Sequence, residues 1–207
     1  MNSGIFLSPH QLRRLLDNQS ESFRFEFTQT RSEDELFIRE IQVGISDALV
    51  YLVEQLREGE ISERALYGAS SCILSKPIND YRILRPQVTG RKISIPNRAE
   101  LDSFMSTFLF ELGNVQLPVD RKLEMILGGI PYAQPFEDGN KRLSRAIEGA
   151  YCISNGLSPT VFSSRQHYID LLFDYNEKQD AAIKQDDGFY VNTNCNSKLL
   201  EHIRNNN

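Results

Sequence analysis

The stretch from Gln134 to Arg145 constrains the fold of this chain most, because it has the pattern of a loop that runs directly into a helix. Gly139 and Asn140 are turn residues that tolerate unusual backbone angles. The residues after them place apolar side chains at helical spacing, and Asn155-Gly156 supplies a stop signal. The apolar positions are Leu143, Ala146, Ile147, Ala150 and Tyr151. The sequence therefore predicts a tight turn followed by an amphipathic helix.

The start of this predicted helix has the features of an anion-binding site. A loop of small residues leaves backbone N–H groups unpaired at a helix N-terminus, where the helix dipole also favours negative charge. Arg142 and Arg145 are three residues apart, so we expect both guanidinium groups on one side of the first turn. Asp138, just before the turn, is a hard oxygen ligand of the kind that holds magnesium beside a phosphate. Together these residues predict a site for a nucleotide polyphosphate.

The composition is typical of a soluble globular protein: 207 residues, of which 40% are hydrophobic and 25% charged. The net charge of −5 argues against general binding to nucleic acid or to anionic membranes. No apolar run approaches the roughly 20 residues of a membrane span, and the N-terminus lacks the regions of a secretory signal. Cys72, Cys152 and Cys195 are far apart, which suggests neither a disulfide framework nor a zinc site. We therefore expect a cytoplasmic protein with reduced cysteines.

The apolar pattern outside this stretch is mostly helical, so the predicted fold class is mainly α. Starts are marked by capping residues and ends by glycine or proline. Gly128-Gly129, late in one predicted helix, favours a close contact with another helix. The predicted helices run from Ser32 to about Glu58, from Ser62 to before Pro77, from Arg98 to Leu112, from Leu117-Pro118 to the loop at Pro131, from Ser163 or Ser164 onward, and from Ser197 onward.

Two segments have extended patterns instead. Phe23, Phe25 and Phe27 alternate with polar residues, which predicts a short strand or an extended arm covering the core. Residues 81–96 alternate apolar side chains with arginine and lysine around Thr89-Gly90, which predicts a small β-hairpin. Taken by itself, this hairpin is as well explained by packing on the helices as by a role in recognition.

The loop-to-helix stretch resembles the motif of the Fic/Doc family, His-x-Phe-x-(Asp/Glu)-(Gly/Ala)-Asn-(Gly/Lys)-Arg with a further Arg three residues on. Seven specified positions match in order: Phe136, Asp138, Gly139, Asn140, Lys141, Arg142 and Arg145. The first position departs, because Gln134 stands where the family has histidine. The resemblance covers residues 61–180 and implies a Fic-type helical core with a β-hairpin flap. It divides the chain into an N-terminal helical extension (1–59), the Fic/Doc core (60–185) and a C-terminal tail with a short helix (186–207).

The resemblance also implies ligands and residue roles. The ligands are ATP, or another nucleotide, and magnesium, with Asp138 as the metal ligand. The backbone of residues 139–141 cradles the phosphates, and Phe136 and Asn140 belong to the same nucleotide-binding motif. Arg142 binds the β/γ side and Arg145 assists. The family transfers a nucleotidyl group to a protein hydroxyl (AMPylation), whereas Lys at position 141 belongs to the Doc branch, which transfers a phosphoryl group. Lys141 is equally well explained as an ordinary solvent-facing helix residue.

Gln134 decides how much activity follows from the resemblance. The family's histidine deprotonates the target hydroxyl, and an amide has no useful basicity near neutral pH. Three interpretations stay open: a degenerate protein that binds nucleotide and transfers poorly, an altered transferase in which Gln134 orients substrate or water, and an active enzyme with an engineered substitution. We prefer the first, since losing a general base costs about 10²–10⁴-fold in rate while the phosphate site survives. Enzyme activity is thus left undecided.

The partners that the resemblance implies are proteins. In the family, a hairpin upstream of the motif holds the target segment by strand addition, and residues 91–97 occupy the comparable place. Many family members are also inhibited by a helix carrying Ser/Thr-x-x-x-Glu-Gly/Asn, whose glutamate pairs with the motif's second arginine, here Arg145. Glu201 is a candidate for this glutamate; a plain capped helix and a separate antitoxin chain are the alternatives. Ser144-x-x-x-Glu148-Gly149 matches in letters, but it lies inside the motif helix, from which we do not expect Glu148 to reach Arg145. A toxin–antitoxin interaction module with a vestigial nucleotide site is therefore a further hypothesis.

Overall fold

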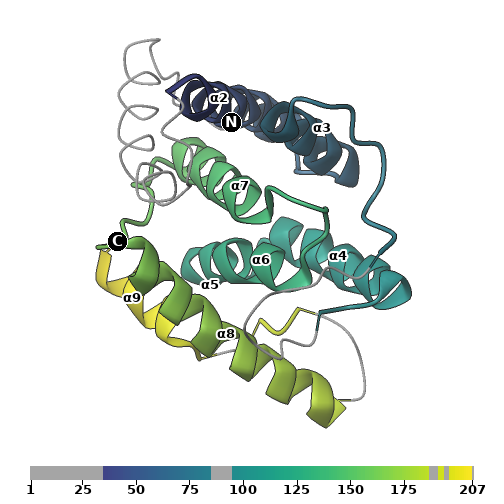
Figure 1. Ribbon diagram of the computed structural model, residues 1–207. Coiled ribbons are helices and arrows are strands. Elements are labelled where there is room, and N and C mark those ends of the chain that lie inside the picture. The colour runs from purple at the N-terminus through teal and green to yellow at the C-terminus, as the bar shows by residue number, and fades with distance from the viewer. Residues whose placement is uncertain (1–34, 85–94, 187–190, 194–195, 207) are drawn as a thin grey trace.

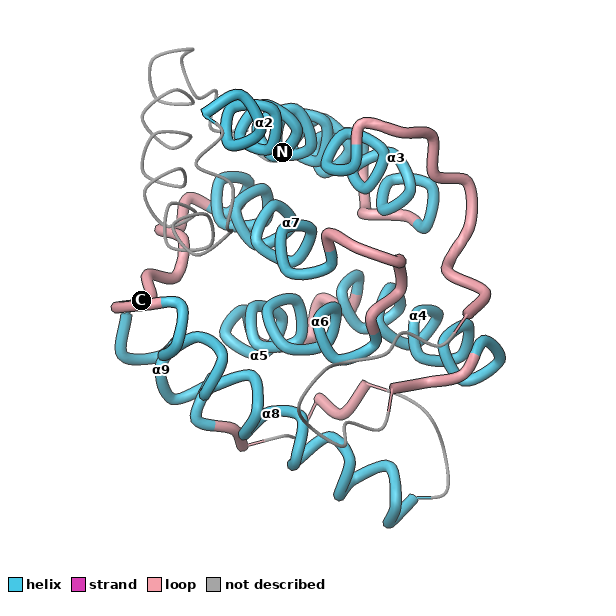
Figure 2. Tube along the Cα trace, viewed as in Figure 1, coloured by secondary structure: helices cyan, strands magenta, loops and turns pink. Residues whose placement is uncertain are grey.

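The computed structural model describes residues 35–84, 95–186, 191–193 and 196–206, and every regular element within them is a helix (Figures 1 and 2). The mainly helical fold class is thereby confirmed. The elements are α2 (Glu35–Glu58), α3 (Glu63–Leu74), α4 (Arg98–Gly113), α5 (Val119–Glu124), the π-helical turn η1 (Met125–Gly129), α6 (Ile130–Ala133), α7 (Asn140–Asn155), α8 (Arg165–Asp186) and α9 (Lys198–Asn206).

The helix that follows the motif, α7, lies at the centre of the arrangement. On one side it packs against α2, which pairs with α3, and on the other it contacts η1 and α6 (Figure 1). Beyond α5, η1 and α6, the helices α8 and α9 cover the face turned away from α2. One hydrophobic core runs through the described residues from Ala48 in α2 to Ile203 in α9. The predicted extension and tail therefore contribute helices to the same core as the predicted central domain.

Capping chemistry explains where the helices begin. Ser62 precedes α3 and its Oγ accepts a hydrogen bond from the N–H of Ala65 at 3.2 Å. Ser197 does the same for α9, accepting from the N–H of Leu200 at 3.2 Å. Of the two serines proposed before α8, Ser164 accepts from the N–H of His167 at 3.1 Å. These predicted caps are confirmed, since each satisfies a donor that the first helical turn leaves unpaired.

The helix leading into the motif differs from its prediction. The sequence places its end at Pro131, but α5, η1 and α6 continue to Ala133. Proline is tolerated here because Pro131 lies in the first turn of the short α6, directly after the π-helical turn, where its missing N–H is not needed. Gly128 lies under the ring of Tyr175, whose carbon atoms approach within 2.7 Å of the place a Cβ would occupy. The predicted close helix contact at the glycine pair is thus confirmed, and Tyr175 of α8 makes it.

The two predicted extended segments fall mostly outside the described residues. Residues 23–27 lie there entirely, as do residues 85–94 of the predicted hairpin. The described stems of that hairpin, residues 81–84 and 95–97, form no strand, so the described chain does not support the β-hairpin flap. None of the described helices combines the length and the apolar character that crossing a membrane requires.

Candidate nucleotide site

The motif loop begins where α6 ends. Gln134 adopts a left-handed conformation (φ 50°, ψ 56°), and its N–H donates to the carbonyl of Ile130 at 3.0 Å. Gly139 is also left-handed (φ 77°) and serves as the N-cap of α7. The first helical hydrogen bond of α7 runs from the N–H of Leu143 to the carbonyl of Gly139 at 2.8 Å. Because the N-cap residue is Gly139, it has no side chain to cap the N–H groups that precede this bond. The predicted turn and helix start are confirmed.

Asn140 holds the loop together with its side chain. Its Oδ1 accepts from the N–H of Phe136 at 3.0 Å, and its Nδ2 donates to the carbonyl of Phe136 at 2.8 Å. The same Nδ2 donates to Oε1 of Gln134 at 3.1 Å. Asn140 is buried, at 4% exposure. Since a buried amide must be hydrogen-bonded, these contacts fix the loop between the two helices.

The Gln134 side chain works within the loop. Besides accepting from Asn140, it donates from Nε2 to the carbonyl of Pro131 at 2.7 Å. Both ends of the amide are therefore engaged by the motif's own residues. The position keeps a structural function that an amide performs well, although an amide cannot accept a proton from a target hydroxyl.

Asp138 and Arg142 form an ion pair at the mouth of the loop. Arg142 Nη2 lies 3.1 Å from Asp138 Oδ2, and the two side chains are 15% and 78% exposed. The second oxygen, Asp138 Oδ1, accepts from the N–H of Gly139 at 2.6 Å. In the described part of the chain, no group of three His, Cys, Asp or Glu side chains is arranged to hold a metal. One exposed carboxylate fits magnesium that arrives with phosphates, because Mg²⁺ usually takes one or two protein carboxylates plus phosphate oxygens and water.

Arg145 is buried and contacts residues outside the motif loop. Its side chain is 5% exposed, Nη1 pairs with Glu148 Oε2 at 3.0 Å, and Nη2 donates to the carbonyl of Thr160 at 3.0 Å. The guanidinium also lies 4.8 Å from the ring centre of Phe162. The two arginines therefore engage different partners, Asp138 for Arg142 and Glu148 for Arg145. The expectation that Glu148 is out of reach of Arg145 is wrong, because residues three apart on a helix are neighbours.

Phe136 belongs to the core. It is 2% exposed, and its ring centre lies 5.7 Å from that of Tyr81 and 6.2 Å from that of Tyr67. Burial raises the pKa of both tyrosine hydroxyls, and the nearby negative charge of Glu63 acts in the same direction. These hydroxyls therefore stay protonated. The motif phenylalanine anchors the loop through aromatic packing.

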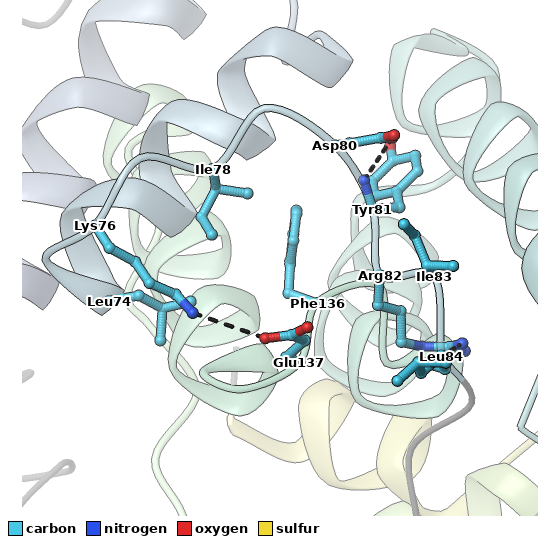
Figure 3. A pocket seen from close by; sticks show the side chains of 10 residues that line it. All are labelled: Leu74, Lys76, Ile78, Asp80, Tyr81, Arg82, Ile83, Leu84, Phe136 and Glu137. Carbon is cyan, nitrogen blue, oxygen red and sulfur yellow. Dashed lines mark hydrogen bonds and ion pairs between the residues drawn. The ribbon is translucent and has the colours of Figure 1, made fainter.

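A pocket of about 380 Å³ opens beside Phe136 and Glu137 (Figure 3). Lys76 and Glu137 face each other across it, with Nζ 3.7 Å from Oε2. The sequence pattern gave no role here to Lys76, Asp80 or Arg82, and no motif signal marks them. The lining residues come from the end of α3, from the connection after it and from the motif loop: Leu74, Lys76, Ile78, Asp80, Tyr81, Arg82, Ile83, Leu84, Phe136 and Glu137.

The remaining predicted site residues lie on the surface or at its edge. Lys141 is half-buried in the first turn of α7, which leaves both interpretations of this lysine open. Glu201 is exposed on α9, which packs against α5 and α8. Arg145, the partner expected for an inhibitory glutamate, is instead paired with Glu148.

Comparison with known proteins matches this chain to solved structures. No family model and no curated protein sequence matches this chain. A crystal structure of a Fic-domain-containing signaling protein from Bacteroides thetaiotaomicron is similar, with a TM-score of 0.65 and 17% sequence identity. The match covers 97% of this chain and 86% of that one. A likeness at this identity concerns the fold alone, and it agrees with the layout that the motif predicts. The chain therefore has the fold of a Fic-domain protein.

Proposed function

We propose that this chain binds a nucleoside triphosphate, with ATP as the expected ligand, and transfers little or nothing from it. The observation that carries the proposal is the start of α7: left-handed Gly139, N–H groups of the first turn without a side-chain cap, and Arg142 beside them. Backbone donors at a helix N-terminus together with a guanidinium form a site suited to phosphate. The Fic fold of the chain supports the same proposal.

The Asp138–Arg142 ion pair suggests how such a ligand is accommodated. A phosphate beside the first turn of α7 competes with Asp138 for Arg142, because both are anions near one guanidinium. With Arg142 engaged by phosphate, the Asp138 carboxylate is the group that would hold a phosphate-bound magnesium ion. The metal would neutralise phosphate charge and orient the chain of phosphates. Without phosphates, the positive end of the helix and Arg142 both disfavour a bare cation at Asp138.

Poor transfer follows from Gln134. Its amide is held by Asn140 and by the carbonyl of Pro131, and it has no basic lone pair to offer a target hydroxyl. A positioned general base contributes about 10²–10⁴-fold to such reactions. The site therefore keeps its phosphate-binding groups but lacks the group that would activate the acceptor.

Calorimetry tests the binding step. ATP is titrated with and without magnesium into the full-length chain, since α9 is part of the core and its removal would disturb the fold. We expect binding at or below millimolar ATP, and at least tenfold weaker binding in Arg142→Ala. Arg64→Ala, which removes an equal charge from an exposed site on α3, is the matched control and should bind as the parent does. No heat of binding at millimolar ATP in folded protein would reject the proposal.

The second candidate is an active transferase acting on a protein docked near the motif. It is favoured by the pocket beside Phe136 and by Ile83 and Leu84 on its rim, which are 77% and 79% exposed. For this candidate we predict that the target docks on residues 91–97. We also predict that an antitoxin or Glu201 inhibits the transfer. Incubation of a lysate with α-labelled and with γ-labelled ATP separates adenylyl transfer from phosphoryl transfer. Label that does not exceed an Arg142→Ala control would exclude both.

A further inference from the structure

Arg82 is a buried arginine whose side chain is directed at the motif loop. It is 4% exposed, although it comes from the irregular connection between α3 and α4. Its Nε donates to the carbonyl of Gln134, and its Nη2 donates to that of Ala133 at 3.1 Å. Its backbone N–H donates to the carbonyl of Pro135 at 2.9 Å. Three consecutive carbonyls at the entry to the motif are thus bound by one residue.

The same guanidinium also reaches the two sides of the segment 85–94. Nη2 donates to the carbonyl of Pro96 at 2.7 Å, and Nη1 donates to that of Leu84 at 3.3 Å. Figure 3 shows the Arg82 side chain at the pocket wall beside Leu84. One side chain therefore joins the ends of the connection to the carbonyls at the end of α6.

The chemistry of this place suits an arginine. The last carbonyls of a helix have no partner within the helix, and the dipole makes that end negative. A guanidinium offers five N–H donors in a fixed planar arrangement, so it can satisfy several carbonyls at once. Gln134 follows directly in a left-handed conformation that is unfavourable for a residue with a Cβ. Contacts to its carbonyl are what can hold it there.

We propose that Arg82 is the positioning residue of the candidate site. By fixing the carbonyls of residues 133–135, it keeps Gln134 in its left-handed turn. That turn sets where the Gln134 amide meets Asn140, and Asn140 in turn fixes Phe136 and the loop before α7. The inference concerns the geometry of the loop and does not depend on which ligand, if any, binds to it.

Amide NMR spectra of the full-length chain test this. In Arg82→Gln, the side-chain amide signals of Gln134 and Asn140 and the backbone signals of Phe136 and Gly139 should shift or broaden. The matched control is Arg98→Gln. Arg98 also donates to a nearby backbone carbonyl, that of Tyr81, but its other partners are Asp80 and Asp102 and not the motif loop. Its variant should leave the four sets of signals in place. Equal shifts in both variants, or unchanged signals in Arg82→Gln, would overturn the proposal.

A rescue experiment separates positioning from mere structural support. Gln134→Gly and Gln134→Ala both remove the amide, but only glycine relieves the left-handed strain. If Arg82 holds that turn, Arg82→Gln should lower the melting temperature by several degrees when combined with Gln134→Ala and clearly less when combined with Gln134→Gly. Equal lowering in the two combinations would contradict the proposal. Should the Arg82→Gln variant not fold, Arg82→Lys, which keeps the charge but loses the planar donors, takes its place in both tests.

Discussion

Gln134 and Asn140 are joined by a hydrogen bond between their side-chain amides, with Nδ2 of Asn140 donating to Oε1 of Gln134 at 3.1 Å. In the motif that this chain resembles, the first of these positions carries histidine. The amide at position 134 donates and accepts at once, because its nitrogen also reaches the carbonyl of Pro131. A loop that needs one donor and one acceptor at this point is therefore well served by glutamine. What the substitution removes is basicity.

Restoring histidine at position 134 should create transfer activity. The backbone there is left-handed, a conformation in which histidine is found more often than most residues, so Gln134→His is expected to fold. An imidazole with a pKa near neutrality can then take the proton of an acceptor hydroxyl. We expect labelling of protein substrates by radioactive ATP to rise by about 10²–10⁴-fold over the parent chain.

The control for this gain is the double variant Gln134→His/Arg142→Ala, which should label at least tenfold less than Gln134→His because phosphate binding is weakened. Gln134→Asn, which shortens the amide without adding a base, should also stay at the parent level. Strong labelling by the parent chain itself would show that position 134 needs no base, and would favour the altered-transferase interpretation.

Mutation of the Arg145–Glu148 pair should cost much more stability than mutation of Arg142. Arg145 and Glu148 form an ion pair with 5% and 0% of their side chains exposed, and Glu148 Oε1 also accepts from the N–H of Thr160 at 2.5 Å. Removing one partner leaves the other charge buried, so Glu148→Ala should lower the free energy of unfolding by about 3–5 kcal/mol. Arg142→Ala breaks a pair whose aspartate is 78% exposed, so it should change the free energy of unfolding by less than about 1 kcal/mol. Urea denaturation measures both.

The double variant Arg145→Met/Glu148→Leu is the control for the buried pair. Its loss of stability should be smaller than the sum of the two single losses, because neither charge is then left alone. Arg145→Met could instead keep full stability and lose ATP binding. That result would mean that Arg145 assists at the phosphates, as the Fic/Doc resemblance implies.

The difference between the two arginines also shows where sequence patterns reach their limit. Local signals predicted the turn at Gly139, the start of α7 and the serine caps, because these depend on residues within about four positions of each other. The same spacing predicted both arginines on one side of the first turn. The partners of a side chain as long as arginine, however, depend on which segments the fold brings near it. Thr160 and Phe162, which contact Arg145, come from the connection after α7.

Arg82 illustrates the same limit at longer range. It lies about 50 positions from the carbonyls of Ala133 and Gln134 that it binds, and its neighbours in sequence suggested a hairpin. Periodicity reports which side chains are apolar, whereas a buried arginine that collects backbone carbonyls leaves no periodic trace. The pocket beside Phe136 was missed for the same reason, since segments distant in sequence form it.

Ser75→Gly should stabilise the chain. Ser75 ends α3 in a left-handed conformation (φ 50°), which is unfavourable for serine and free of strain for glycine. Relief of about 1 kcal/mol of strain exceeds the extra entropy that glycine gives the unfolded chain, so we expect the free energy of unfolding to rise by about 0.5 kcal/mol. Urea denaturation is the measurement.

Ser103→Gly is its matched control. Ser103 is exposed within α4, where glycine should cost about 0.5 kcal/mol. If both substitutions destabilised the chain alike, the backbone at Ser75 would not be strained.

Glu124 should make stability depend on pH, because it is buried where α5 meets α9. Arg121 Nη1 lies 3.1 Å from Glu124 Oε2, and the hydroxyl of Ser197, the cap of α9, donates to Oε1. Burial raises the pKa of this carboxyl, although Ser197 and Arg121 act in the opposite direction. An acid with a raised pKa in the folded state binds more protons there than in the unfolded chain. Its contribution to stability is therefore complete below about pH 4.3, the ordinary pKa of Glu, and is lost as pH rises through the raised value.

Glu124→Gln removes this titration while keeping an oxygen that can accept from Ser197. Urea denaturation of both proteins between about pH 4 and pH 8 should show the parent losing free energy of unfolding relative to Glu124→Gln as pH rises from about 4.3, with the difference constant once the carboxyl is fully ionised. Glu177→Gln, which replaces an exposed glutamate on α8, controls for the loss of one negative charge. A parent that gains stability relative to Glu124→Gln over the same range would mean that Arg121 and Ser197 outweigh burial, because the ionised form would then be the one the fold favours.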